Sequence, residues 1–215
     1  MKTVAIIPIK SRSTRVKGKN FKKIFGKPLY TFLLDKIKKC KFEEIYVDTD
    51  SNEIKKYCIK NSIKIINRLP KLAKDNANGN DLLNYHYKII KADLYFQLFI
   101  TSPLITIKTI NDCIKKLKKS KKHDSIVTSR RIFTWYWFNN KPINYNPTKL
   151  PRSQDAKPVI VETTALYGIK SEVLKKRKCR IGYNPFFYDV SEKEAVDLDN
   201  EIDFLYLKSL LKKQK

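Results

Sequence analysis

The sequence is poor in the residues from which compact catalytic and metal sites are usually built. It contains 4 cysteines and 2 histidines among 215 residues. The cysteines are widely separated and form no CxxC pair, so neither a disulfide framework nor a zinc site is indicated, and free thiols in a reducing compartment are expected. No Ser-His-Asp or HExxH arrangement is present, and we expect His86 and His123 to be packing or surface residues. The sequence therefore offers no nucleophile–base pair of its own.

Long apolar segments are also missing. No run of about 18 apolar residues exists, so no membrane span is expected. The first apolar run, residues 3–9, is too short and too soon interrupted to be a signal peptide. A cytoplasmic location is the expectation that follows.

Acidic residues are scarce relative to basic ones. The chain has 46 Lys and Arg against 21 Asp and Glu, a formal net charge of +25, and only 8 of the basic residues are Arg. Three interpretations stay open: a solvated lysine-rich surface, a basic funnel for a polyanionic small molecule, or a nucleic-acid-binding surface. The third is the least favoured, because the lysines run through every predicted element and no nucleic-acid-binding module is recognisable.

The chain does contain an alternation of short apolar strands with helical segments. Its hydrophobic content of 42% is typical of a globular protein, and its length suits one domain with a sizeable core. The alternation predicts an α/β fold with an open, mostly parallel sheet covered on both faces, whose ligands bind at the carboxyl ends of the strands. Asp50 or Ser51 is expected to cap the helix that follows it. The predicted strands are residues 3–9, 44–47, 63–66, 94–100 and 125–128, the predicted helices are residues 28–39, 52–61, 81–91, 109–118 and 203–211, and residues 159–169 return to the core.

A different pattern follows the fifth predicted strand. Residues 133–138 and 142–145 flank Asn139-Asn140-Lys141 and predict a β-hairpin. Its aromatic rings are more than one small sheet can cover. Two interpretations of residues 130–157 stay open: an excursion that packs on another subunit, or a segment whose rings cover the main sheet.

The loop after the first strand, residues 8–20, combines several cations with three hydroxyl groups and one glycine. A triphosphate needs backbone N–H donors and cations that arrive from several directions. Arg can bind two phosphate oxygens at once, while Lys acts as a mobile point charge. The spacings GxxxxGK[ST] and GxGxxG are both absent, so this is neither a P-loop nor a dinucleotide-binding loop. The loop favours a phosphate site, with an ordinary basic surface loop as the alternative.

A pair of carboxylates, Asp197 and Asp199, follows Glu194-Ala195 near the other end of the chain. In an extended segment, residues i and i+2 point the same way, so both carboxylates can face one cation. Hard oxygen ligands in small number suit Mg²⁺, which also binds phosphates. A solvated turn or a helix cap is the alternative.

Seven short blocks occur in a fixed order along the chain. They are Lys19-Asn20 with Gly26-Lys27-Pro28-Leu29; Thr49-Asp50-Ser51; Arg68-x-Pro70-x-Leu72-Ala73-x-Asp75; Thr101-Ser102-Pro103-Leu104; Arg152-x-Gln154-Asp155; Glu162-Thr163 with Tyr167; and Glu194-Ala195-x-Asp197-Leu198-Asp199-x-x-x-Asp203-Phe204. In this order they resemble the acylneuraminate (CMP-sialic acid) cytidylyltransferase family and, more distantly, the CMP-Kdo synthetases, over nearly the whole chain.

The resemblance implies a Rossmann-like three-layer α/β nucleotidyltransferase fold with a mostly parallel sheet and a small β-hairpin dimerisation arm. Residues 1–215 would form a single cytidylyltransferase domain, with residues 130–157 as the dimerisation and substrate arm. The protein would be a homodimer that uses CTP and Mg²⁺.

The resemblance also implies roles for individual residues. Lys19 and Arg15 would stabilise phosphate charge, and Asp197 and Asp199 would hold Mg²⁺ beside the α-phosphate, so that Lys19, Arg15 and Asp199 are the expected catalytic residues. A partner's arm would bring Arg152 and Gln154 near a sugar carboxylate, with Tyr167 lining the pocket. The residues expected to bind the nucleotide are Lys10, Ser13, Arg15, Lys19, Asn20, Arg68, Ala77 and Asn78.

Three positions depart from the family pattern. Lys10 and Lys17 stand where the family usually has Arg and Pro, and Phe99 stands where a Gln helps recognise the sugar in sialic-type members. The departure at Phe99 leaves the nucleotide part of the prediction intact and the acceptor open. A nonulosonic acid such as a sialic, legionaminic or pseudaminic acid is favoured, with Kdo-like sugars and non-sugar phosphonates or phosphates as alternatives.

These features predict an enzyme that transfers CMP from CTP to an acidic sugar and releases pyrophosphate. The acceptor hydroxyl would attack the α-phosphorus directly, so the protein needs only to align substrates and stabilise charge. A UTP- or GTP-using pyrophosphorylase is disfavoured because its glycine-rich GxGxR loop is missing. A basic nucleic-acid-binding protein and an inactive homologue also stay open, and the presence of both Asp197 and Asp199 disfavours the inactive homologue.

Overall fold

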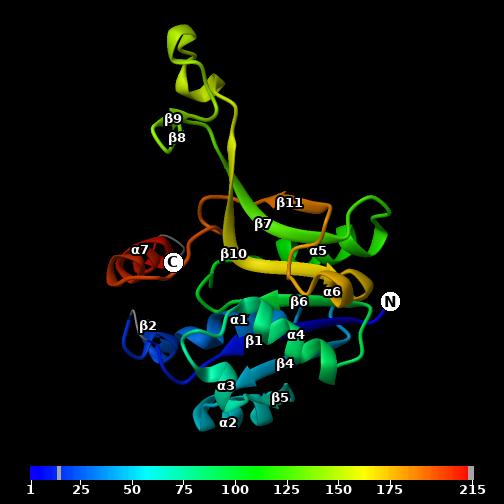
Figure 1. Ribbon diagram of the computed structural model, residues 1–215. Coiled ribbons are helices and arrows are strands. Elements are labelled where there is room, and N and C mark those ends of the chain that lie inside the picture. The colour runs from blue at the N-terminus through cyan, green and yellow to red at the C-terminus, as the bar shows by residue number, and fades with distance from the viewer. Residues whose placement is uncertain (14–15, 213–215) are drawn as a thin grey trace.

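The computed structural model describes residues 1–13 and 16–212 and is built around a seven-stranded sheet (Figure 1). The strands are β1 (Thr3–Ile9), β4 (Glu44–Thr49), β5 (Lys64–Asn67), β6 (Leu94–Leu98), β7 (Ser125–Ile132), β10 (Val159–Lys170) and β11 (Pro185–Asp189). Their order across the sheet is β11-β7-β10-β6-β1-β4-β5. The short strands β2 (Lys23–Ile24) and β3 (Lys27–Pro28) pair separately.

The sheet is mostly parallel, as the sequence predicts. β1 pairs in parallel with β4 and β6, β4 with β5, and β7 with β11. β10 is the exception, because it is antiparallel to both of its neighbours, β6 and β7. The chain leaves the sheet along β7 and returns beside it along β10, so this reversal follows from the excursion between them.

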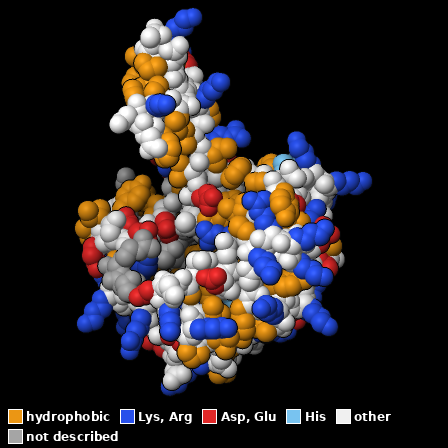
Figure 2. Space-filling view, in the orientation of Figure 1, with side chains coloured by type: hydrophobic (Ala, Val, Ile, Leu, Met, Phe, Trp, Pro, Cys, Tyr) orange, Lys and Arg blue, Asp and Glu red, His pale blue; other side chains and the backbone are white. Residues whose placement is uncertain are grey.

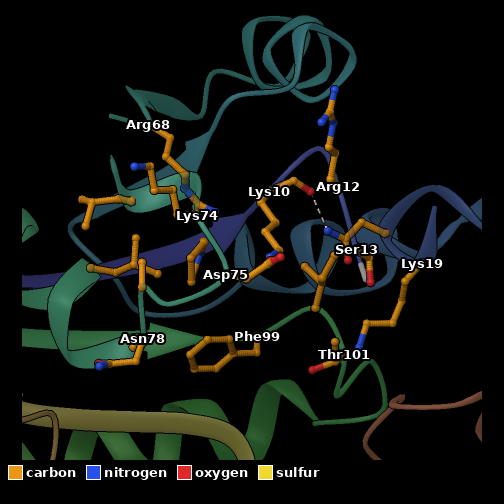
Figure 3. A pocket seen from close by; sticks show the side chains of 17 residues that line it. Lys10, Arg12, Ser13, Lys19, Arg68, Lys74, Asp75, Asn78, Phe99 and Thr101 are labelled. Carbon is orange, nitrogen blue, oxygen red and sulfur yellow. Dashed lines mark hydrogen bonds and ion pairs between the residues drawn. The ribbon is translucent and has the colours of Figure 1, made fainter. Parts of the chain in front are cut away.

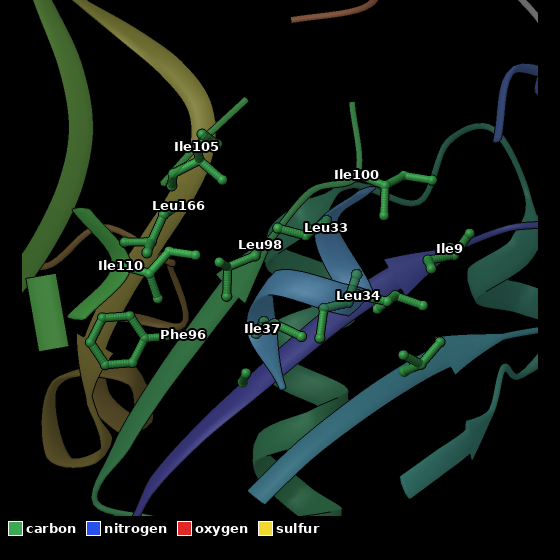
Figure 4. Packing of buried hydrophobic residues seen from close by; sticks show 14 of the residues in the cluster. Ile9, Leu33, Leu34, Ile37, Phe96, Leu98, Ile100, Ile105, Ile110 and Leu166 are labelled. Atoms are coloured by element: carbon green, nitrogen blue, oxygen red, sulfur yellow. The ribbon is translucent and has the colours of Figure 1, made fainter. Parts of the chain in front are cut away.

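Helices cover both faces of the sheet, and the alternation of side chains along β1 shows why. Ala5, Ile7 and Ile9 pack in a core with α1 (Leu29–Ile37), α2 (Asn52–Lys60) and α5 (Ile107–Lys119) (Figure 4). Val4 and Ile6 point to the opposite face and pack with α4 (Gly79–Ile89) and α6 (Ser171–Arg177). These two cores give the three-layer α/β arrangement that was expected.

Several helices begin with a side chain that accepts a backbone N–H at the carboxyl edge of the sheet. The Ser51 hydroxyl caps α2, Thr106 caps α5, and Asn78 forms a reciprocal capping box with Asp81 at the start of α4. A one-turn helix, α3 (Pro70–Ala73), lies between β5 and α4. The caps fix where the loops that precede these helices must lie.

The last helix, α7 (Glu201–Lys212), lies outside the two sheet-covering layers (Figure 1). Its Phe204 and Leu207 are buried in a third cluster with Val16, Leu29 and Leu198. Burial of each such side chain contributes about 1.5–3 kcal/mol. This cluster joins the carboxyl-terminal segment to the loop that follows β1.

Residues 130–157 form an arm that projects away from the sheet (Figures 1 and 2). The predicted hairpin is present, with strands shorter than expected: β8 (Trp137–Phe138) pairs with β9 (Lys141–Pro142). Its two central residues, Asn139 and Asn140, have φ of 47° and 59°, as a tight primed turn requires. The arm ends in the 3₁₀ turns η2 (Pro147–Lys149) and η3 (Ser153–Asp155). Trp137 and Phe138 are 56% and 68% exposed, so these rings do not cover the main sheet.

The described residues bear on two expectations from the sequence, one about membrane-spanning helices and one about the cysteines. None of the helices found there has the length and apolar character to cross a bilayer. The four cysteines are all unpaired thiols, and burial raises the pKa of Cys40 and Cys58 to about 11.

Candidate active site

The loop that follows β1 is held at the carboxyl edge of the sheet by its neighbours. The Ser11 backbone N–H and hydroxyl both donate to Asp50, at 2.6 Å each. The Asn20 side chain donates to the Lys10 carbonyl at 2.7 Å, which closes the loop on itself. Burial opposes ionisation of Asp50, but the hydrogen bonds from Ser11 outweigh it, and the pKa of Asp50 is lowered from its usual value. Asp50 therefore anchors the loop, and Ser51 is the helix cap.

A cavity of about 440 Å³ lies beside this loop (Figure 3). The loop supplies one part of its lining, residues 68–79 a second, and residues 99–101 a third. Arg15, one of the eight residues expected to bind the nucleotide, lies outside the described residues. The other seven all line this cavity: Lys10, Ser13, Lys19, Asn20, Arg68, Ala77 and Asn78.

Lys19 connects the two ends of the chain at this cavity. It begins the 3₁₀ turn η1 (Lys19–Phe21) directly after Gly18, whose φ of 64° lies in the left-handed region. The Lys19 ammonium donates to the Leu198 carbonyl at 2.6 Å and lies 3.3 Å from Asp199 Oδ1. Only 8% of the Lys19 side chain is exposed, so these partners replace water around the cation. The cationic loop and the carboxylate segment therefore meet at one place.

The carboxylate segment is fixed by the residue between the two carboxylates. Leu198 is fully buried in the cluster that α7 completes, so Asp197 and Asp199 are expected to share the opposite side of the segment. The Ser102 hydroxyl lies 3.4 Å from Asp197 Oδ1. The Asp203 carboxylate accepts a hydrogen bond from the backbone N–H of Asp199 at 2.7 Å. This bond fixes the turn that leads into α7.

These two carboxylates suit a magnesium ion that also binds phosphate. Mg²⁺ is commonly held by one or two carboxylates together with waters and substrate phosphates. Across residues 1–13 and 16–212, no cluster of three or more His, Cys, Asp or Glu side chains could hold a metal. Two carboxylates would leave the other coordination positions of such an ion to waters and phosphate oxygens.

Arg68 is held in the cavity wall by a buried ion pair. Its Nε donates to Asp48 Oδ1 at 2.9 Å, and one terminal nitrogen donates to the Asp48 carbonyl at 3.1 Å. The other Asp48 oxygen lies 2.6 Å from His86 Nε2. The side chains of Asp48 and His86 are completely buried. His86 is therefore a packing residue, as expected, and it completes the environment of the carboxylate that holds Arg68.

The residues expected to bind the sugar lie in two separate places. Tyr167 on β10 is buried, and its ring packs edge-on against Phe99 with centroids 6.3 Å apart. Arg152 and Gln154 are exposed on the arm, where Arg152 Nε lies 2.6 Å from Asp155. None of these three residues is among those that line the cavity of its own chain, although Tyr167 contacts the lining residue Phe99.

Three polar residues near the cavity were not singled out from the sequence: Asp48, Gln97 and Arg180. Asp48 and Gln97 lie within apolar strands, and a polar residue in such a run is the signal that could have identified them. Arg180 lies between α6 and β11, two elements that the sequence pattern did not predict. Burial raises the pKa of Tyr167 above its usual value, although the adjacent Arg180 cation acts in the opposite direction.

Comparison with known proteins finds relatives that align with nearly the whole chain. CMP-N,N'-diacetyllegionaminic acid synthase of Legionella pneumophila is 25% identical over 228 residues, 98% of this chain and 97% of that protein. N-acylneuraminate cytidylyltransferase A of Danio rerio is 25% identical over 210 residues, 93% of this chain and 48% of the fish protein. The chain spans about half the length of the N-acylneuraminate cytidylyltransferases that it matches.

The fold and the family are both identified by these comparisons. A solved structure of CMP:2-keto-3-deoxy-manno-octonic acid synthetase complexed with CTP is similar over 100% of both chains, with a TM-score of 0.74 at 17% identity. The family model described as Cytidylyltransferase matches residues 4–205, almost the entire chain. This chain belongs to the cytidylyltransferase family.

Proposed function

We propose that this protein transfers CMP from CTP to an acidic sugar and releases pyrophosphate. The observation that carries the proposal is the meeting of Lys19 with Asp199 beside a cavity whose lining is rich in cations. A triphosphate needs positive charge around its oxygens, and a metal ion bound to it needs carboxylates close by. This arrangement supplies both from opposite ends of the chain.

The nucleotide occupies the cavity in this proposal. Lys10, Ser13 and Lys19 bind phosphate oxygens from the first loop, together with Arg15 and Asn20. The cytidine lies at the wall formed by residues 68–79, near Arg68, Ala77 and Asn78. Because Arg68 is fixed by Asp48, its remaining donors are already oriented before the ligand arrives.

Asp197 and Asp199 are the residues that would hold Mg²⁺. When bound, the ion supplies positive charge that orients and neutralises phosphate oxygens. Lys19 keeps one carboxylate oxygen of Asp199 in place through their 3.3 Å contact.

The chemical step needs no nucleophile from the protein. The acceptor hydroxyl attacks the α-phosphorus, a new P–O bond forms, the α–β bridging bond breaks and the hydroxyl proton passes to solvent. Pyrophosphate leaves with the bridging oxygen. Lys19, together with Arg15 of the same loop, would stabilise the charge that develops on the phosphates. Stabilisation of this kind is usually the largest single contribution to the rate acceleration.

A nonulosonic acid is the acceptor that we favour. Two relatives are named for N-acylneuraminate and for N,N'-diacetyllegionaminic acid. A 2-keto-3-deoxy-manno-octonic acid is the alternative, because the protein in the similar solved structure is named for that sugar.

We also propose that the protein is a cytoplasmic homodimer. Its four free thiols are typical of a reducing compartment. The arm carries exposed apolar side chains that a second copy would cover, and Arg152 and Gln154 would then reach the partner's sugar site.

Pyrophosphate release tests this function directly. The protein is incubated with CTP, UTP, GTP or ATP, with Mg²⁺, and with a panel of 2-keto-3-deoxy acids. CTP with at least one acid is expected to give pyrophosphate, whereas UTP, GTP and ATP are expected to give none. Lys19→Ala and Asp199→Asn are each expected to lower the rate by roughly 10²–10³-fold or more, as loss of a group that stabilises developing charge does.

Lys17→Ala is the matched control, because Lys17 is an exposed lysine of the same loop. It should keep nearly full activity. Full activity in Lys19→Ala or Asp199→Asn would refute the role of that residue, and faster release from UTP than from CTP would refute the nucleotide assignment.

A further inference from the structure

Arg180 places a cation against two aromatic rings at the edge of the cavity. Its guanidinium carbon lies 3.7 Å from the centre of the Tyr167 ring and 5.8 Å from the centre of the Phe99 ring. Phe99 itself lines the cavity. Stacking on aromatic faces leaves the in-plane N–H donors of an arginine available for a ligand.

The Arg180 side chain is positioned by packing rather than by an acid. The backbone N–H of Arg180 donates to Asn80 Oδ1 at 2.9 Å, which anchors the main chain at this residue. A Cβ atom on Gly79, the first residue of α4, would lie 2.7 Å from Arg180 Nη1, so the guanidinium would have to shift if any other residue stood there. Within the described ranges, Arg180 has no ion pair and its guanidinium has no hydrogen bond. An arginine that is stacked on an aromatic ring and has no carboxylate partner is prepared to bind an anion.

Gln97 adds an acceptor next to the same glycine. Its Nε2 donates to the Gly79 carbonyl at 3.1 Å, which fixes the orientation of the amide. The residue is completely buried, and its Oε1 finds no hydrogen-bond partner among the residues that the structure describes. A buried carbonyl without a partner costs about 1–3 kcal/mol, so the site is incomplete without a donor. The hydroxyl of a ligand is such a donor.

Phe99 and Gly79 line the cavity, and Arg180, Gln97 and Tyr167 contact one or both of these residues without lining it themselves. The loop follows β1, and Arg68 follows β5, whereas Phe99 follows β6 and Tyr167 lies on β10, across the sheet. Figure 3 shows Phe99 on one side of the cavity, with Ser13 and Lys19 on the other. A nucleotide whose phosphates lie at the loop and whose cytidine lies at the wall of residues 68–79 leaves Phe99 and the β6–β10 side for the acceptor.

We propose that Arg180 binds the carboxylate of the acid sugar and so selects acidic acceptors, while Gln97 Oε1 accepts a hydroxyl of the same sugar. This inference rests on the proposed function, because the sugar is its acceptor. The guanidinium presents two parallel donors that match a carboxylate, whereas the Phe99 ring, which lines the cavity, gives an apolar wall for the sugar ring. Arg180 is thus a specificity-determining residue supplied by the same chain, in addition to the arm residues Arg152 and Gln154.

The test compares Arg180→Met with the wild type, because Met keeps an unbranched side chain over the Tyr167 ring and removes the charge. The KM for N-acetylneuraminic acid or 2-keto-3-deoxy-manno-octonic acid, whichever is turned over, is expected to rise about 10- to 100-fold, the usual value of a hydrogen bond to a charged group. The KM for CTP should stay within about twofold of the wild-type value. With the carboxamide of the same sugar, the two proteins should become equal. Arg180→Lys should recover part of the loss.

Arg177→Met is the matched control, since Arg177 is an exposed arginine that also stacks on a tyrosine, with 4.7 Å from its guanidinium carbon to the Tyr183 ring centre. It should leave both KM values unchanged. Thermal unfolding by circular dichroism checks that each variant is folded. An unchanged acceptor KM in folded Arg180→Met, or an equal loss with the carboxamide, would overturn the inference and leave the proposed function standing.

Direct binding separates the two proposals when the wild type releases no pyrophosphate with any acid. N-acetylneuraminic acid and 2-keto-3-deoxy-manno-octonic acid are then titrated calorimetrically into wild type and Arg180→Met. Weaker binding to Arg180→Met supports the anion site although the proposed function has failed. Equal binding, or no binding to the wild type, overturns the inference as well.

Discussion

At the scale of single residues, two buried cations organise the cavity, and each is fixed by an oxygen from a distant part of the chain. Lys19 is held by the carbonyl of Leu198, and Arg68 by the carboxylate of Asp48. A buried cation without such a partner is strongly unfavourable, so both contacts are needed for folding as well as for binding. The same atoms that stabilise the fold therefore set the positions of the charges.

The Asp48–Arg68 pair gives a prediction for stability. Asp48→Ala leaves Arg68 buried without its partner, and the free energy of unfolding is expected to fall by about 3–5 kcal/mol. Asp112→Ala is the control, because its ion pair with Lys108 is exposed and should be worth less than about 1 kcal/mol. Urea unfolding followed by circular dichroism measures both. An Asp48→Ala variant as stable as Asp112→Ala would show that the buried pair contributes nothing.

At the scale of elements, the sequence predicted those with strong local patterns. The alternating apolar strands and amphipathic helices up to β7 are present within a few residues of their predicted bounds, as is the hairpin turn at Asn139-Asn140. β11 and α6 were missed, because α6 is a short, lysine-rich segment and β11 follows an irregular link. The antiparallel direction of β10 could not be read from its apolar residues, since direction is a property of the chain path.

The candidate site was predictable to the extent that it lies in local motifs. The cations of the first loop and the Asp197–Asp199 pair could be recognised from their types and spacing. The contact between Lys19 and Asp199 joins residues 180 positions apart, and only the burial of α7 against the loop creates it. Arg180 was missed for the same reason, because its importance arises from Gly79 and Tyr167, which are distant in sequence.

The arm provides the prediction at this scale. Trp137 and Phe138 at its hairpin are exposed, and a dimer that buries them would lose two large apolar contacts in the double variant Trp137→Ser/Phe138→Ser. Light scattering is expected to give a dimer for the wild type and a monomer for the double variant. Ile59→Ser is the control, since Ile59 is 72% exposed on α2, far along the chain from the arm. A wild type that is monomeric at micromolar concentration contradicts the arm's role.

At the scale of the whole molecule, the net charge of +25 comes from basic residues in two kinds of place, the outer surface and the cavity. On the face shown in Figure 2, lysines and arginines are spread over the surface instead of being gathered into one patch, as a solvated lysine-rich surface would be. Among the described residues that line the cavity, by contrast, five are cations and one is an acid, Asp75, while Asp48 and Asp199 pair with two of these cations from outside the lining. These cations are Lys10, Arg12, Lys19, Arg68 and Lys74. The cavity therefore concentrates the field in which a triphosphate would bind, while the overall charge speeds its approach at low salt.

Calorimetric titration of CTP in the presence of Mg²⁺ tests most directly whether the two ends of the chain form one nucleotide site. We predict one CTP bound per chain, an affinity that falls as salt rises, and binding at least about tenfold weaker in Lys19→Ala but unchanged in Lys17→Ala. No heat with CTP, or equal affinity of Lys19→Ala and the wild type, would contradict this account.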